Sequence, residues 1–384
     1  MLHDLVIAGA GPVGATLALA VDDADLDVVV VDARPEGGTL RGDRSLALSH
    51  GARLVLERLG VWTPLAAQAG AVTPIVDIDI SQARGFGSAR LTAADAGVPA
   101  LGYVVRYLAL QRSLDAALAR RGIRVRWNTR VGAVGGTPAY AAVDIEGEAD
   151  PLLARLAVVA DGAGAVVAGL ERRRHDYGES ALVASVWVDG APPGLAFERF
   201  TADGPVALLP EGDHHGLVWT AKPGRSAELL ALDDAAFLAR LAGHFGPRAG
   251  RFVRVADRRS FPLVLEFVPR PAASRTVVIG NAAQTLHPVA GQGFNVGLRD
   301  AYELSRVIVA TPQDALGGRA MLDRYATRRR TDRAAGIAFT HGLVTLFGAD
   351  HALLRWPRGV GLSLLDALPP AKRAFTRTML FGLR

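Results

Sequence analysis

Cysteine is absent from this sequence, and lysine is nearly absent. The lack of cysteine excludes a disulfide framework, a thiolate metal site, a cysteine nucleophile and the redox-active cysteine pair of flavin disulfide reductases. The only lysines are Lys222 and Lys372, so almost all of the 43 basic residues are arginines. Basic patches with interleaved aromatic residues and nucleic-acid motifs are also missing. We therefore expect no nucleic-acid partner.

The sequence also lacks a stretch typical of a transmembrane helix. Two long uncharged segments, 5–21 and 277–298, are interrupted by glycine, proline or polar residues, which a cofactor site explains better than a membrane span. The first predicted strand starts within five residues of Met1, which leaves no room for a signal or transit peptide, so we expect a cytoplasmic protein. A length of 384 residues with 50% hydrophobic and 21% charged residues suits a globular chain of two domains.

The first informative motif is GAGPVG at Gly9 to Gly14. It follows an apolar run and precedes a helical run of small residues, which is the strand, turn and helix context that a GxGxxG motif requires. Gly9 then permits the tight turn, Gly11 lets the backbone approach a pyrophosphate, and Gly14 lets the helix pack on the strand. The next predicted strand ends in Asp32, which can accept hydrogen bonds from a ribose diol. An ordinary glycine turn is the alternative, but this context favours NAD or the AMP half of FAD.

A second motif, VVIGNAAQTLHPVAGQGFNVGLRD at Val277 to Asp300, decides between these two cofactors. An apolar strand turns at Gly280 and Asn281, and three later glycines leave backbone N–H groups uncovered before a predicted helix. Such a glycine-rich turn can bind a negatively charged or electron-rich ring edge. A nicotinamide dehydrogenase has no need of this second element, so the sequence favours FAD.

The two motifs resemble those of the FAD-dependent aromatic hydroxylases (class A flavoprotein monooxygenases). Within this group the chain is most similar to the hydroxylase family of ubiquinone biosynthesis, above all to the 2-polyprenyl-6-methoxyphenol hydroxylases. The resemblance covers nearly the whole chain, and most relatives have Gly-Asp where Gly280-Asn281 matches the variant of the ubiquinone subfamily. The other shared blocks are DRSLALSHGARLVLERLGVW from Asp43, ADG from Ala160, ERFTADGPVALLP from Glu198 and FPL from Phe261.

The resemblance implies an FAD-dependent monooxygenase that uses NAD(P)H as co-substrate. In that family NAD(P)H reduces the flavin, O2 adds to give a C4a-hydroperoxide, and the distal oxygen goes to the ring of a polyprenylated phenol. The protein supplies orientation, exclusion of water and electrostatics. Two alternatives remain, namely another flavin oxidoreductase of the same fold and a non-catalytic FAD-fold subunit of a biosynthetic complex. The second alternative is suggested by ADGAGAVVA from Ala160, where relatives continue ADG with a serine and an arginine.

The resemblance also implies roles for individual residues. Pro288 is expected to flank the flavin ring on the substrate side, and Gly291, Gln292 and Gly293 to present backbone to its pyrimidine edge. His287 is either an acid or base toward the substrate hydroxyl or a packing residue, and the second role is favoured because the phenol oxygen already activates the ring. The expected FAD contacts are Gly9, Gly11, Pro12, Val13, Gly14, Asp32, Ala33, Arg34, Arg44, Gln111, Val131, Asp161, Gly162, Gly280, Asn281, Pro288, Gly291, Gln292, Gly293, Phe294 and Asn295.

Three further expectations concern polar residues near these motifs. Arg44 matches the family arginine near the pyrophosphate. At Tyr107 relatives commonly have Arg, Asn or Gln, so Arg106 or Gln111 is expected to supply that cofactor contact. His214 and His215 are expected in a turn, and no group of residues has metal-ligand spacing.

The order of strands and helices predicts an α/β fold of two discontinuous domains. A Rossmann-like FAD-binding domain is expected from residues 1–75, 98–176 and 275–336. A β-rich substrate domain, 76–97 and 177–274, is inserted into it, and 337–384 form a C-terminal helical region. The space between the two domains is the expected substrate site.

Basic charge is concentrated at the C-terminus. Residues 319–384 contain 12 of the 43 basic residues and 4 of the 38 acidic ones. A basic and apolar region can lie on an anionic membrane surface, which would place a cytoplasmic enzyme at the inner membrane, near its polyprenylated substrate. The alternative, which amphipathic helices generally favour, is packing on the FAD domain or on a partner among other ubiquinone-biosynthesis proteins, with the arginines solvated.

Overall fold

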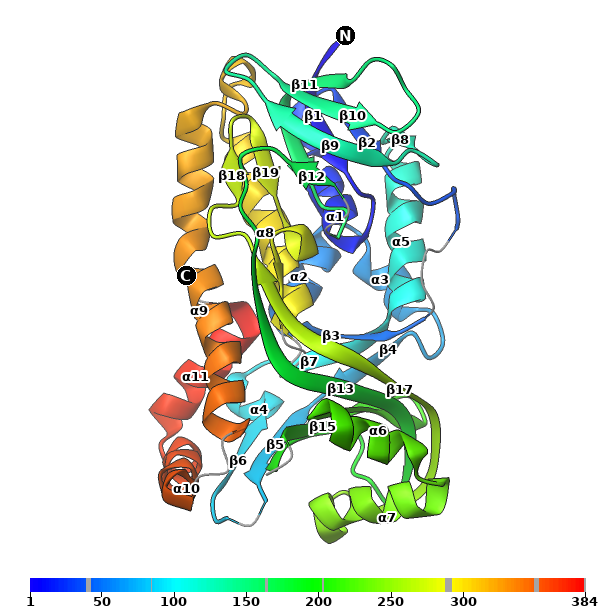
Figure 1. Cartoon of the computed structure of the whole chain (residues 1–384), viewed down its shortest axis with the longest axis vertical. Coiled ribbons are helices and arrows are strands. Elements are labelled where there is room, and N and C mark those ends of the chain that lie inside the picture. The colour runs from blue at the N-terminus through cyan, green and yellow to red at the C-terminus, as the bar shows by residue number, and fades with distance from the viewer. Residues whose placement is uncertain are drawn as a thin grey trace.

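The structure is a computed structural model that describes residues 1–38, 43–83, 85–162, 165–201, 204–286, 292–348 and 352–382. Two large sheets lie toward opposite ends of an elongated molecule (Figure 1). Two long, bent strands, β13 (Arg173–Asp189) and β17 (Arg251–Phe267), pair with each other and lead from one end to the other. The fold is therefore mixed α/β, as predicted.

The first sheet has nine strands and forms the centre of the Rossmann-like part. Its main order is β12-β9-β10-β11-β1-β2-β8, and β19 pairs in parallel with the C-terminal half of β11. The parallel strands β1, β2, β11 and β19 are almost wholly apolar, as expected for strands that are covered on both faces. The bounds are β1 (Leu2–Ala8), β2 (Val28–Val31), β8 (Val125–Arg126), β9 (Val131–Gly136), β10 (Ala141–Ile145), β11 (Leu152–Val159), β12 (Val166–Val167), β18 (Ala272–Ala273) and β19 (Thr276–Val278).

Helices cover one face of this sheet and bury its largest apolar cluster. Helix α1 (Pro12–Ala20) lies against α5 (Tyr107–Arg120) and α8 (Gln292–Val309), and α9 (Arg319–Gly348) packs on α8. The cluster also includes residues of α2 (His50–Arg58) and α3 (Trp62–Ala66). Short 3-10 turns are η1 (Asp22–Ala24), η3 (Gly280–Ala282) and η5 (Gln313–Ala315).

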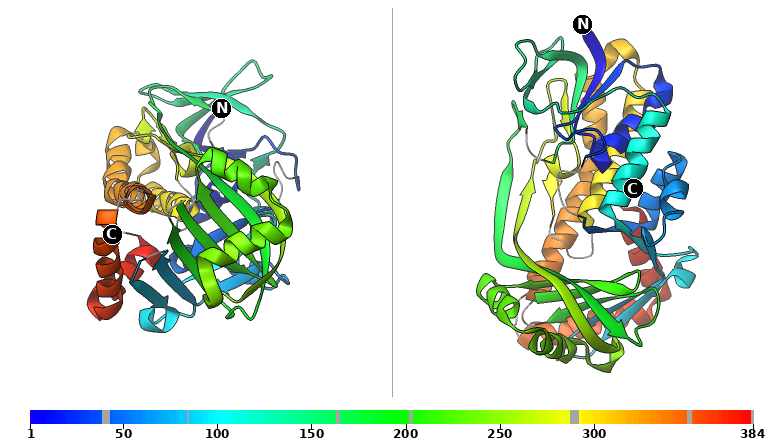
Figure 2. Two further views of the ribbon diagram at one scale, coloured as in Figure 1. Left: turned by 60° about the horizontal axis from the view of Figure 1, so that its bottom comes forward. Right: turned by 90° about the vertical axis from the view of Figure 1, so that its right-hand side faces the viewer.

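The second sheet has eight strands in the order β20-β17-β13-β16-β15-β14-β5-β6. Alternate residues such as Phe197, Leu208 and Trp219 are buried on one face, under α6 (Pro223–Ala231) and α7 (Asp234–Phe245). The other bounds are β5 (Asp77–Gln82), β6 (Ser88–Thr92), β14 (Leu195–Thr201), β15 (Gly204–Glu211), β16 (His214–Ala221), β20 (Gln284–Thr285) and η2 (Gly246–Arg248). Figure 2 shows the two helices lying on the side of this sheet that faces away from the first sheet.

A small antiparallel sheet, β3-β7-β4, connects the two halves. It consists of β3 (Ser45–Ser49), β7 (Gly102–Arg106) and β4 (Val72–Ile75). The short helix α4 (Ala93–Ala96) lies between β6 and β7 along the chain. The predicted turn at His214 and His215 is wrong, because both residues belong to β16 and Gly212 and Asp213 form the turn before it.

The chain ends in two helices beside the second sheet, α10 (Ala352–Ala367) and α11 (Pro369–Phe381). Helix α11 lies so close to α2 that a Cβ added to Gly51 would be 2.6 Å from the Leu380 carbonyl oxygen. Within the part of the chain that the structure describes, no helix is both long enough and apolar enough to cross a bilayer.

Candidate cofactor and substrate site

The predicted cofactor motifs meet at one edge of the nine-stranded sheet. The parallel strands β1, β2, β11 and β19 all end there, and they lead into Gly9, Asp32, Asp161 and Gly280 respectively. Backbone hydrogen bonds hold the ends together, with Gly9 N donating to the Val31 carbonyl (2.7 Å) and Ile279 N to that of Val159 (3.0 Å). Segments that are far apart in sequence thus form one edge, where open α/β sheets bind ligands.

The three glycines of the first motif have different surroundings. Gly9 has φ +105°, and a Cβ there would be 2.7 Å from the Ala160 carbonyl oxygen, while one on Gly14 would be 1.9 Å from the Gly9 oxygen. A Cβ on Gly11, in contrast, would meet no atom within 4 Å. Gly9 and Gly14 are therefore required by the fold, whereas Gly11, at the N-terminus of α1, borders open space.

Asp32 is buried directly after β2 and accepts two backbone hydrogen bonds, from Ala10 N (2.6 Å) and Arg34 N (2.8 Å). A carboxylate has about four acceptor positions, so it keeps capacity for a ribose diol. Arg34 makes two 2.7 Å hydrogen bonds to Asp115 and a third, of 3.1 Å, to the Ala10 carbonyl. Although burial disfavours its charge, Asp115 keeps the pKa of Arg34 above its ordinary value. The Arg34 guanidinium thus stabilises the glycine turn through its hydrogen bond to the Ala10 carbonyl.

Gln111 lies beside the same turn. Its Nε2 donates to the Ala10 carbonyl and to Asp115, both at 2.9 Å, while its Oε1 is buried and has no partner among the described residues. A buried, unpaired amide oxygen suits a donor supplied by a ligand, such as a ribose hydroxyl. Arg106, the other predicted candidate, instead pairs with Asp43 at 2.7 Å. Arg44 is exposed and stacks on Tyr107, 5.0 Å from the ring centre.

The distal motif is described in part. His287, Pro288 and Gly291 lie outside the described residues, and Gln292 begins α8. A Cβ on Gly297 would be 3.0 Å from the Gly280 Cα, so α8 and η3 need glycine at their contact. The remaining predicted contacts are placed as follows: Pro12 and Val13 in the first turn of α1, Ala33 after Asp32, Val131 at the start of β9, Asp161 and Gly162 after β11, Asn281 in η3, and Gly293 and Phe294 in the first turn of α8.

Asn295 connects α8 to the small sheet. Its Oδ1 accepts a hydrogen bond from Ser49 N (2.8 Å) and its Nδ2 donates to the Ala47 carbonyl (2.9 Å). The side chain is buried. Asn295 therefore holds β3 against the start of α8, where the sequence places the flavin-binding loop.

A buried ionic network fixes α8 to α9. Asp300 is fully buried and accepts from Arg329 Nε (2.8 Å) and Gln284 Nε2 (2.6 Å), and Arg333 Nε donates to the Gln284 Oε1 (2.7 Å). Asp332 accepts from both Arg299 and Arg329, and these two charges lower its pKa although burial opposes this. Arg329 and Arg333, which belong to the basic C-terminal region, are thus buried and hydrogen-bonded within the protein. The predictions that the arginines of this region are solvated or lie on a membrane are therefore wrong for these two residues.

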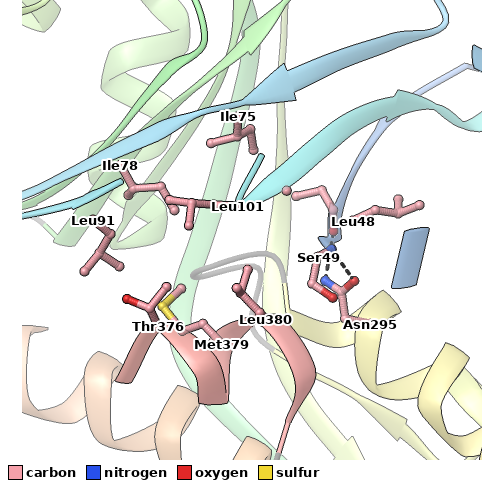
Figure 3. Close-up of a pocket in the computed structure, with 12 residues that line it drawn as sticks. Leu48, Ser49, Ile75, Ile78, Leu91, Leu101, Asn295, Thr376, Met379 and Leu380 are labelled. Atoms are coloured by element: carbon pink, nitrogen blue, oxygen red, sulfur yellow. Dashed lines mark hydrogen bonds between the residues drawn. The ribbon is translucent and has the colours of Figure 1, made fainter. Parts of the chain in front are cut away.

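An apolar cavity of about 70 Å³ lies between α11, the small sheet and the edge of the second sheet (Figure 3). Thr376, Met379 and Leu380 of α11 point into it from one side, and Ile75, Ile78, Leu91 and Leu101 face them. Ser49 and Asn295, hydrogen-bonded to each other, lie at the end of the cavity next to α8. Its lining comes from segments assigned above to both predicted domains. The sequence did not predict the individual lining residues, because apolar side chains that meet from distant segments carry no local signal.

Comparison with known proteins gives concordant results. The family described as "FAD binding domain" matches residues 3–340. Ubiquinone hydroxylase UbiL of Rhodospirillum rubrum is 33% identical over 97% of this chain and 88% of its own. The 3-demethoxyubiquinol 3-hydroxylase of Escherichia coli is 30% identical over 96% of both chains. The crystal structure of p-nitrophenol 4-monooxygenase PnpA from Pseudomonas putida superposes with a TM-score of 0.78 at 18% identity, over 100% of this chain and 99% of its own, which shows the shared fold.

Proposed function

The chain belongs to the FAD binding domain family, and we propose that it is an FAD-dependent monooxygenase that hydroxylates the ring of a polyprenylated phenol in ubiquinone biosynthesis. NAD(P)H is the proposed reductant and O2 the source of the oxygen atom. The observation that carries the proposal is the edge of the nine-stranded sheet, where Gly11 borders free space and four parallel strands end together. The similarity to relatives named as hydroxylases counts against the alternative of a non-catalytic subunit.

Bound FAD supplies the oxygen-transfer chemistry, and the protein holds its two halves. Gly11 and the N-terminus of α1 would receive the pyrophosphate, because uncovered N–H groups and the helix dipole favour an anion. Asp32 would accept hydrogen bonds from the adenosine ribose, and the free oxygen of Gln111 would accept from a further hydroxyl. Gly293, with its neighbours of the distal loop, is proposed for the isoalloxazine ring, and Asn295 for fixing β3 next to it.

We propose that the apolar cavity receives the first part of the polyprenyl tail. The walls are mostly aliphatic, and burying each CH₂ of a tail stabilises the complex by about 0.8 kcal/mol. Leu380→Trp should fill the cavity and lower kcat/KM for a prenylated phenol, because the tail loses its place. The same phenol without a prenyl group is the control, and its kcat/KM should change little. Equal effects on both substrates would refute this use of the cavity.

The polyprenyl tail must be collected from a membrane, and α10 is the proposed contact. Trp356, Val360 and Leu364 of α10, and Leu368 directly after it, follow at every fourth position and are 71%, 43%, 51% and 49% exposed. Such spacing places them on one helical face. The adjacent α11 exposes Arg373 and Arg377, and each basic residue near an anionic surface contributes about 1 kcal/mol. We propose that this face lies on an anionic bilayer surface and that the enzyme is a peripheral protein of the inner membrane, on the cytoplasmic side.

Vesicle flotation at low salt tests the membrane contact. The unaltered protein should float with vesicles containing phosphatidylglycerol and stay behind with purely zwitterionic ones. Trp356→Glu combined with Leu364→Glu should abolish flotation, whereas Val309→Glu, at another exposed apolar residue (58%), should not. Absence of flotation with both vesicle types would refute the contact and favour delivery by a partner protein.

The hydroxylase proposal itself is tested with purified protein. It should be yellow, contain about one FAD per chain, and oxidise NADH or NADPH in the presence of a panel of short-chain prenylphenols with formation of a catechol-type product. A colourless protein that cannot be reconstituted with FAD would support the non-catalytic alternative instead.

A further inference from the structure

Glu198, the acidic residue of the shared ERFT block, lies in the middle of β14, where most neighbouring residues are buried. Along this strand Phe197 is buried under α7, with its ring 5.8 Å from that of Phe245. Glu198 therefore lies on the opposite face of the sheet, together with Ala196 and Phe200. This is the face turned toward the FAD-binding domain, because Ala196 packs with Ile75 and Val104, and Phe200 with Leu101 and Leu380.

Both of these apolar clusters include residues that line the cavity. Glu198 stands between the two clusters on β14. Its cross-strand partners are Ile80 of β5 and Ala207 of β15, and the row continues through Val218 of β16 and Val183 of β13. Small or apolar side chains thus flank Glu198 along this row of the sheet, at the edge of the proposed substrate site, and α9 also packs against β14 and β15.

Glu198 makes no hydrogen bond or ion pair with any residue that the structure describes. Its neighbour Arg199 points to the other face, where it donates to the Ser81 hydroxyl at 3.0 Å. Burial alone raises the pKa of Glu198 to about 7, with no contribution from a charged group. The residue is partly exposed, so a ligand can reach the carboxyl, and a ligand that donates a hydrogen bond would lower the cost of placing it in these apolar surroundings.

We propose that Glu198 binds the ring hydroxyl of the phenolic substrate and accepts its proton during hydroxylation. This inference rests on the proposed function, which supplies O2, NAD(P)H and a phenol. As the oxygen atom adds to the ring carbon, the phenol O–H bond breaks and its electron pair moves toward the ring. The proton forms a new O–H bond on the Glu198 carboxylate. The ring then loses its own C–H proton to water, the C–H electron pair restores the aromatic ring, and the phenol oxygen regains a proton from Glu198. The carboxylate is thereby restored and is neither oxidised nor reduced.

The pKa of about 7 suits this role. A general base is most effective when its pKa is near the working pH, and such catalysis contributes about 10²-fold to 10⁴-fold. Glu198→Gln should therefore lower kcat for a short-chain prenylphenol by this factor while FAD content stays unchanged. The kcat of the unaltered enzyme should rise with pH through about 7 as the carboxylate ionises, and this rise should be absent in the variant.

Binding without turnover gives a second readout. Titration of oxidised holoenzyme, followed by the flavin absorbance, gives the dissociation constants of a short-chain prenylphenol and of its methyl ether. The unaltered enzyme should prefer the phenol by about 10-fold to 100-fold, as expected for one hydrogen bond to a charged group. Glu198→Leu should remove the preference, and Glu228→Gln, on the exposed side of α6, should preserve it.

These measurements separate the possible failures. If the unaltered enzyme hydroxylates the phenol but Glu198→Gln has the same kcat, pH profile and binding preference, the role of Glu198 is refuted and the proposed function stands. If the unaltered FAD-loaded enzyme hydroxylates no phenol, the proposed function fails. The binding preference for phenol over ether still decides in that case whether Glu198 recognises a hydroxyl.

Discussion

Replacing Gly11 with valine should abolish FAD binding without disturbing the apoprotein. The backbone at Gly11 has φ −62° and ψ 174°, which any residue can adopt, and a Cβ there would contact no atom within 4 Å. The change should therefore alter the free energy of unfolding of the apoprotein by no more than about 0.5 kcal/mol. The valine side chain would, however, occupy the space proposed for the pyrophosphate.

The size of the effect follows from the hydrogen bonds that would be lost. Each bond from a backbone N–H to a charged phosphate contributes about 1.5–3 kcal/mol. If valine displaces the pyrophosphate from two such donors, the loss of about 3–6 kcal/mol raises the dissociation constant by roughly 10²-fold to 10⁴-fold. The variant should accordingly be purified without flavin.

Gly14→Ala is the matched comparison. A Cβ there would be 1.9 Å from the Gly9 carbonyl oxygen, so the backbone must move, at a cost of about 1–3 kcal/mol or more. Both variants should lose FAD, but only Gly14→Ala should lower the melting temperature of the apoprotein. Flavin absorbance and thermal unfolding measure the two quantities. Full flavin content in Gly11→Val, or equal destabilisation of both apoproteins, would refute the reasoning.

Three further predictions test other parts of the structure. Because burial raises the folded-state pKa of Glu198 to about 7 from 4.5, the ionised form is unfavourable in the folded state, so Glu198→Gln should stabilise the protein by about 3 kcal/mol at pH 8. Its advantage should shrink as pH falls from about 7 to 4.5, and a difference in urea unfolding that does not vary with pH would contradict this. Arg329→Met leaves the fully buried Asp300 without its ion-pair partner and should cost about 3–5 kcal/mol. The same change at the exposed Arg328 should cost little, and equal effects would argue against the network. Asn295→Ala removes both hydrogen bonds to β3 and should release more H₂O₂ for each NAD(P)H oxidised. An unchanged ratio of product to NAD(P)H would count against its positioning role.

The edge of the nine-stranded sheet where the two glycine motifs meet was largely predictable, because each motif is recognised from residues that are neighbours in the sequence. A glycine motif between a strand and a helix, followed by Asp32 at the end of the next strand, predicts the part of the site proposed for the AMP half of FAD. The distal motif has the same strand, turn and helix order. Parallel strands that share a sheet then bring both motifs to one edge, so two local patterns determine a contact between residues about 270 positions apart.

The features that the sequence did not predict depend on long-range contacts. The segment with Arg328, Arg329 and Arg330 reads as a charged, solvated helix face, and only the fold shows that Asp300 comes within 2.8 Å of Arg329. The cavity is formed when α11, at the end of the chain, meets strands β4, β5 and β7. Glu198 was recognised as part of a shared block, but which face of β14 it occupies follows only from the packing of Phe197 and Phe200.

Oxygen incorporation into product tests the central claim most directly. Purified FAD-loaded protein is supplied with NADPH or NADH, a short-chain prenylphenol and ¹⁸O₂, and the product is analysed by mass spectrometry. The account predicts a product that is heavier than the substrate by one ¹⁸O atom, and an unlabelled oxygen when the label is in the water instead. A flavin-containing protein that oxidises NAD(P)H with these phenols but incorporates no oxygen from ¹⁸O₂ would contradict it.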